Sequence, residues 1–284
     1  MEEEIIEASN DNDPKTAQLV YQTLMNSVDD LKFLLDESAL LLEHFAAIQK
    51  SIIKTFTYCA LERLNVASIS LHTLYGKYLS ERKYEFSIGI IMRTVYLDYL
   101  ILLNALEIVF RNNENNNPYE EELSDFCLTM LSDSAIHALK YFDSNKVPQE
   151  KLARMYSLQV HMHEECFEPY AHDGTKPILK KKKSFSQQEL VKRLKKSSYP
   201  HLSRKEDAYM FYSKYDHFGK MYHKISRRPL TAEFIHLGEN LRELPRSLAL
   251  IVVLLRLLAP EDVNLIADAK RVEEYIQKMD GRET

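Results

Sequence analysis

The stretch from Arg82 to Arg111 reads RKYEFSIGIIMRTVYLDYLILLNALEIVFR, and it is apolar almost all round when it is wound into an α-helix. Such a helix must be covered by neighbours on every side, so the stretch predicts the centre of a helical bundle. It is also long enough to span a membrane. Charged and polar groups at mid-bilayer depth are costly, however, and the stretch carries Arg93, Asp98, Asn104 and Glu107. We therefore predict no transmembrane segment.

The sequence on both sides of this stretch repeats the helical pattern. Pro14 opens a run with apolar residues at three- and four-residue steps, and Ser38 to Glu81 reads as one or two long helices. The asparagine-rich run 112–118 predicts a loop. Further helices are expected at 118–142, 148–169, 205–226, 230–244, 246–259 and 261–279. The prediction is an all-α fold, a single bundle of about nine mostly antiparallel helices.

The chain divides into four parts by composition. Residues 1–13 hold six acidic and no basic residues, which predicts an acidic flexible leader without the basic region of a signal peptide. Residues 14–170 are expected to form the helical bundle, and residues 171–205 a basic linker or insertion outside it. Residues 206–284 are expected to supply C-terminal helices that pack on the same bundle.

Two scarce residue types narrow the class of protein. The chain has only 6 glycines, so it is poor in the tight turns and the phosphate-binding loops that need them. Its three cysteines, Cys59, Cys127 and Cys166, lie far apart in apolar helical segments, which is typical of reduced thiols in a cytoplasmic protein. We expect no cofactor and no disulfide framework.

The strongest anomaly is electrostatic. From Lys176 to Lys205 the chain has eleven basic residues and one acidic residue, Glu189, a local net charge of +10 in a chain whose total is −5. The segment joins a lysine run to a short basic amphipathic helix from Leu190 to Lys196, which Ser184 or Ser186 would cap. The candidate nucleic-acid-binding residues are Lys180, Lys181, Lys182, Lys183, Lys192, Arg193, Lys195 and Lys196.

This segment allows several interpretations. A basic strip concentrates anions, so it could contact the phosphates of RNA or DNA, an anionic membrane surface or an acidic protein partner. It could equally be a solvated loop that pairs with the acidic bundle. Aromatic residues for base stacking are sparse, with Phe185 and Tyr199 alone in the segment.

Several titratable groups are candidates for metal binding or catalysis. At helical spacing His161, Glu165 and Glu168 share a face, but a helical di-iron site needs two Glu-x-x-His pairs and we predict no metal site. Arg154 and His161 fit the loose Arg-x(4–6)-His pattern of HEPN ribonucleases, at about the frequency that chance gives.

Three further residues form the candidate catalytic set. Arg93 lies on an apolar helix, where it must meet a carboxylate or several carbonyls, as a structural ion pair or as a catalytic cation. Ser213 and His217 fall on the polar face of helix 205–226, opposite an aromatic stripe, where a Ser/His pair could transfer a proton.

Two short motifs carry a family resemblance. Residues 91–100, IMRTVYLDYL, and residues 212–219, YSKYDHFG, resemble the arginine-bearing helix and the Ser-x-x-x-His stretch of an uncharacterised bacterial all-α family often associated with mobile elements. That family is sometimes compared with HEPN-like domains, and the resemblance spans roughly residues 40–260. One position differs, because Leu97 stands where the family usually has Glu four residues after its arginine.

Two functional classes follow. The first is a non-catalytic binding or regulatory protein whose basic segment engages nucleic acid or an acidic partner. The second, implied by the resemblance, is a HEPN-like metal-independent ribonuclease of toxin or defence type. It would use His217 or His161 with Arg93 or Arg154. The first is our leading prediction because it depends on the charge anomaly alone. The sequence is also compatible with a homo-oligomer.

Overall fold

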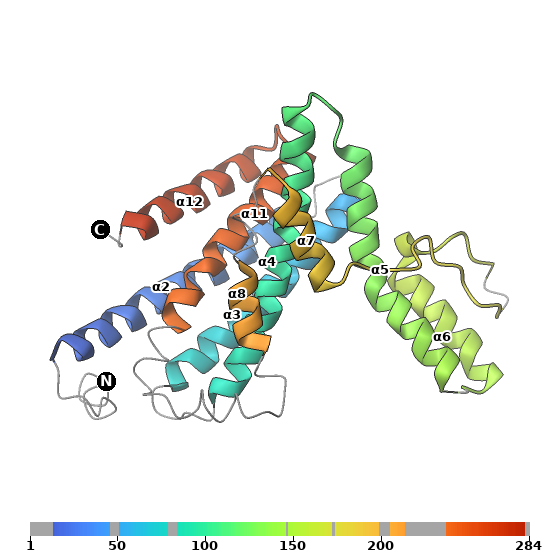
Figure 1. Cartoon of the computed structure of the whole chain (residues 1–284), viewed down its shortest axis with the longest axis horizontal. Helices are drawn as coiled ribbons and strands as arrows, with labels where there is room; N and C mark the ends of the chain where they lie inside the picture. Colours follow the sequence, from blue (N-terminus) through green and yellow to red (C-terminus); the bar gives the residue numbers. More distant parts are fainter. Residues whose placement is uncertain are drawn as a thin grey trace.

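The computed structural model describes residues 14–45, 51–78, 84–145, 147–171, 174–198, 205–213 and 237–281. Its helices are α2 (Pro14–His44), α3 (Ile52–Tyr78), α4 (Glu85–Glu114), α5 (Glu120–Ser144), α6 (Gln149–Met162), the 3-10 helix η3 (Glu164–Cys166), α7 (Gln187–Lys196), α8 (Lys205–Ser213), α11 (Glu243–Leu258) and α12 (Val263–Asp280). The predicted all-α bundle is confirmed (Figure 1). The acidic leader 1–13 lies outside the described residues.

Helix α4 is the centre of the bundle, as its sequence predicts. It packs against α3, α5, α7, α8 and α11, and Met92, Leu100 and Ile108 are fully buried along its length. By length and composition α4 could cross a membrane from Phe86 to Glu114, and half of its most apolar 18-residue window is buried inside the structure. Packing against five helices accounts for its apolar composition.

Some boundaries differ from the sequence pattern. The helix expected at 148–169 ends at Met162, and the chain continues through η3 into an extended bridge between Phe167 and Leu179. The pattern predicts a break between residues 244 and 246, yet α11 runs through Pro245. Proline is tolerated there because the first turn of a helix has backbone N–H groups without an intrahelical acceptor.

Helix α7, which the sequence places outside the bundle, instead packs on α4. Leu190, Val191 and Leu194 are buried in the central core, although the other side of this short helix is basic. Ser186 caps α7: its side chain accepts from the Glu189 N–H, and Glu189 accepts from the Ser186 N–H in return. A helix with such strong segregation of apolar and basic residues is held by its apolar face.

A second, smaller core lies apart from the main one. Its buried residues are Ala135, Leu139, Phe142, Tyr156, Val160, Cys166 and Phe167, from the C-terminal half of α5, from α6 and from η3 with the residue after it. Figure 1 shows α6 and the end of α5 projecting from the bundle. Helix α5 joins both cores, because Leu123, Phe126 and Cys127 in its first half belong to the central one.

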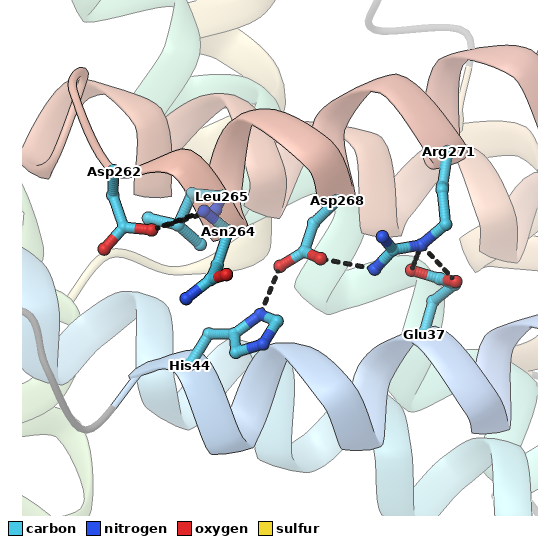
Figure 2. A network of polar contacts seen from close by, with 7 residues as sticks. All are labelled: Glu37, His44, Asp262, Asn264, Leu265, Asp268 and Arg271. Carbon is cyan, nitrogen blue, oxygen red and sulfur yellow. Dashed lines mark hydrogen bonds and ion pairs between the residues drawn. The ribbon is translucent and has the colours of Figure 1, made fainter.

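A polar network fixes α12 against α2 (Figure 2). The carboxylate of Asp268 is fully buried; it accepts from Arg271 and lies 2.7 Å from His44 Nδ1. Arg271 also donates to Glu37 of α2 at 2.9 Å. Two acidic and two basic side chains therefore meet where a lone buried carboxylate would be strongly unfavourable.

We expect Asp268→Ala to lower the free energy of unfolding by about 3 kcal/mol, because it removes the acceptor of both His44 and Arg271. Urea denaturation measures the change. The control is Glu274→Ala, which removes an exposed carboxylate from the same helix and should change stability by less than about 0.5 kcal/mol. Equal stability of the two variants would contradict the structural role of the network.

Candidate functional site

Arg93 lies half-buried on α4 and contacts a tyrosine of α8. Its guanidinium donates to the hydroxyl of Tyr209 at 3.4 Å and lies 5.7 Å from the centre of that ring. The carboxylate of Asp98, later in α4, accepts two hydrogen bonds from Arg63 of α3, of 2.9 and 3.0 Å. The sequence predicts a buried Arg93, but the exposure of its side chain in the structure is intermediate. Its contact with Tyr209 helps to join α8 to α4.

The rest of the predicted catalytic set is only partly described. Ser213 is the last residue of α8, and His217 lies outside the described residues. The alternative pair, Arg154 and His161, lies exposed on α6, in the projecting part of the chain. The ribonuclease therefore stays a hypothesis of the sequence.

No metal-binding cluster appears in the described residues. No group of three or more His, Cys, Asp or Glu side chains among them is arranged to hold an ion. The helical face proposed for His161, Glu165 and Glu168 does not form, because α6 ends at Met162 and the chain changes direction through η3.

The three cysteine thiols have low reactivity. Cys127 and Cys166 are buried and Cys59 is half-buried, and all three are free of disulfides. Burial raises the pKa of each thiol, that of Cys166 to about 11. At neutral pH they are protonated and therefore poor nucleophiles.

Part of the basic segment pairs with the chain's own carboxylates. Lys176 contacts Asp143 at 2.5 Å, Lys181 contacts Asp125, and Lys195 contacts Glu206 at 2.9 Å. Lys180 donates to the backbone carbonyl of Glu165 at 3.0 Å. These lysines hold the segment against α5, η3 and α8. One half of the segment therefore pairs with the bundle, as the second interpretation of the sequence expects.

The other half faces solvent. Four exposed lysines make no ion pair with any residue that the structure describes: Lys182, Lys183, Lys192 and Lys196, here called the lysine surface. Lys183 and Lys192 both lie near Glu189, whose pKa is lowered by hydrogen bonds from Ser186 and by the charges of these two lysines. The lysine run and the basic helix therefore present their charges together.

Arg193, also a candidate phosphate contact, points elsewhere. Its guanidinium carbon lies 5.0 Å from the centre of the Phe185 ring and 5.6 Å from that of Phe126. Nothing in the sequence indicates this contact, because Phe126 reads as an ordinary core residue of α5 and lies 67 positions away.

A groove of about 850 Å³ lies beside the segment. Its walls are the start of α3, the first half of α5, Glu165 and Lys180; the lining residues are Ser51, Ile52, Thr55, Pro118, Glu121, Glu122, Ser124, Asp125, Leu128, Glu165 and Lys180. Four carboxylates and one amine give it a negative charge. It is unsuited to an anionic ligand, and no motif in the sequence points to it.

Comparison with known proteins gives no match: no family model, no curated protein and no solved structure is similar to this chain.

If α7 is a folded platform for the lysine surface, Leu194→Ala should lower the free energy of unfolding by about 3 kcal/mol, because Leu194 is fully buried in the central core. Thermal or urea denaturation measures the loss. Lys192→Ala on the exposed side of α7 is the matched control, with an expected change below about 0.5 kcal/mol. A Leu194→Ala protein as stable as its control would show that α7 does not dock.

Proposed function

We propose that this protein is a non-enzymatic binding protein that holds the phosphate backbone of a nucleic acid on its lysine surface. The observation that carries the proposal is the division of the basic segment. Lys176, Lys181 and Lys195 satisfy carboxylates of the chain itself, whereas Lys182, Lys183, Lys192 and Lys196 remain exposed on a helix and turn that are packed in place.

Several like charges held together repel one another, and a helix loses stability from such pairs. Lys192 and Lys196 stand one turn apart on α7, so they repel in the absence of an anion. A polyanion that bridges them relieves the repulsion and releases its condensed counterions, which is the main source of affinity in non-specific binding to nucleic acid.

Nucleic acid suits this surface better than an acidic protein. Arginine has a planar guanidinium group that can form two parallel hydrogen bonds with a carboxylate, whereas the lysine ammonium acts as a point charge. A surface of lysines therefore lacks the geometry that favours carboxylates. The acidic groove beside the surface would repel an acidic protein that extended over both, whereas a backbone can follow the lysines alone.

The proposal predicts that replacing Lys182, Lys183, Lys192 and Lys196 with Gln weakens binding to a 20-base-pair DNA duplex. The slope of log affinity against log salt concentration should become shallower by about 3 to 4, close to 0.9 for each phosphate that the protein no longer neutralises. Fluorescence anisotropy over a range of salt concentrations gives both quantities.

The matched control replaces four exposed lysines elsewhere, Lys140, Lys151, Lys270 and Lys278, with Gln, for the same change in net charge. This control should keep the wild-type slope. Equal reductions in the two variants would show a general charge effect and no site. Binding of an acidic protein with no salt-sensitive binding of DNA or RNA would assign the surface to the other class of partner.

A further inference from the structure

Arg193, Phe185 and Phe126 form a cluster that adjoins the lysine surface in the chain, because Arg193 follows Lys192 and Phe185 lies two residues after Lys183. The two rings stack with centres 5.6 Å apart and planes 22° apart, and Arg193 lies over both. Phe126 belongs to α5, Phe185 to the turn before α7, and Arg193 to α7. The cluster therefore ties three segments together at the point where the lysine run meets the basic helix.

The charge of Arg193 also acts on a carboxyl group of α5. Burial opposes ionisation of Glu122, yet the pKa of this carboxyl is lowered, by Asn112 and Arg111 and also by the nearby charge of Arg193. A guanidinium that lies over two packed rings is directed toward the protein. It differs in this from Lys192 and Lys196 on the same helix, which face solvent.

The cluster also occupies the ring of Phe185, the aromatic residue in the described part of the segment. Phe185 is the one aromatic residue between positions 174 and 198, and its ring is occupied by Phe126 and Arg193. Proteins that hold single strands stack successive bases on exposed rings, and each stacked base contributes substantially to affinity. The described part of the segment therefore presents positive charges but no exposed aromatic ring on which a base could stack.

From this we infer the class of ligand and the role of Arg193, an inference that rests on the proposed function. The lysine surface binds the phosphate backbone without contacting bases, so it takes a duplex, with its higher density of charge, in preference to a single strand. Arg193 is a positioning residue: it holds the lysine-bearing turn and helix in register and contacts no phosphate.

The test uses the full-length wild-type chain and three DNA probes: a 20-base-pair duplex, a 20-nucleotide single strand, and a strand of equal length made wholly of abasic sites. Anisotropy at several salt concentrations gives the affinity and salt slope of each. We expect the two single strands to bind within about twofold of each other, and the duplex to bind more tightly. A normal strand that binds roughly fivefold or more above the abasic strand reveals base stacking and overturns the inference.

The role of Arg193 is tested by comparing Arg193→Met with its neighbour Lys192→Gln, since each removes one positive charge. Met retains an apolar stem over the rings. We expect Lys192→Gln to make the salt slope shallower by about 0.9 and Arg193→Met to leave it unchanged. A folded Arg193→Met protein with the same reduction in slope as Lys192→Gln would make Arg193 a phosphate contact.

The outcomes separate the two proposals. If neither the three DNA probes nor an RNA duplex of the same length binds in a salt-sensitive way, the proposed function fails and this inference fails with it. If all bind with similar slopes but the base-bearing strand is favoured, the lysine surface keeps its function and the inference alone is wrong. The comparison of normal with abasic strands needs no variant, so misfolding of a mutant cannot obscure it.

Discussion

The requirement to cover α4 on every side organises this protein. A thirty-residue helix with apolar residues around most of its circumference cannot be stable in water unless neighbours exclude solvent from all its faces. Helices α3, α5, α8 and α11 supply much of that cover. The remainder comes from α7, a ten-residue helix whose three apolar residues fill the central core. As a result, the strongly basic segment that contains α7 packs against the bundle.

Docking of α7 decides what the basic residues can do. Because Leu190 and Leu194 face α4, the charged side of the helix is directed outward. The lysines that reach α5, η3 and α8 find acceptors there, whereas Lys182, Lys183, Lys192 and Lys196 make no ion pair with the described residues. The division between paired and exposed lysines is thus a consequence of packing, and it turns a uniform run of charge into a surface with a definite position.

The acidic residues around the segment have a complementary role. Asp125 and Asp133 of α5 accept from Lys181 and Ser184, so the turn that leads into α7 is fixed by polar contacts on one side and by the Phe126–Phe185 stack on the other. A turn restrained in this way loses less conformational entropy when it binds a ligand than a free loop would. The groove next to it is acidic, so it would repel an anion that the proposed lysine surface attracts.

The sequence alone determined the fold class and most helices, because hydrophobic periodicity and the Asn-rich loop are local signals: the all-round apolar stretch 82–111 became the central helix. It also located the basic segment, since charge is read directly from composition. It could not show that α7 docks, that Arg193 lies over Phe126, or that Asp268 meets His44 across more than two hundred residues. Those contacts join residues distant in the chain, and periodicity carries no information about which partner covers a given face. Tertiary packing alone decided which lysines of the described segment pair with carboxylates and which stay exposed.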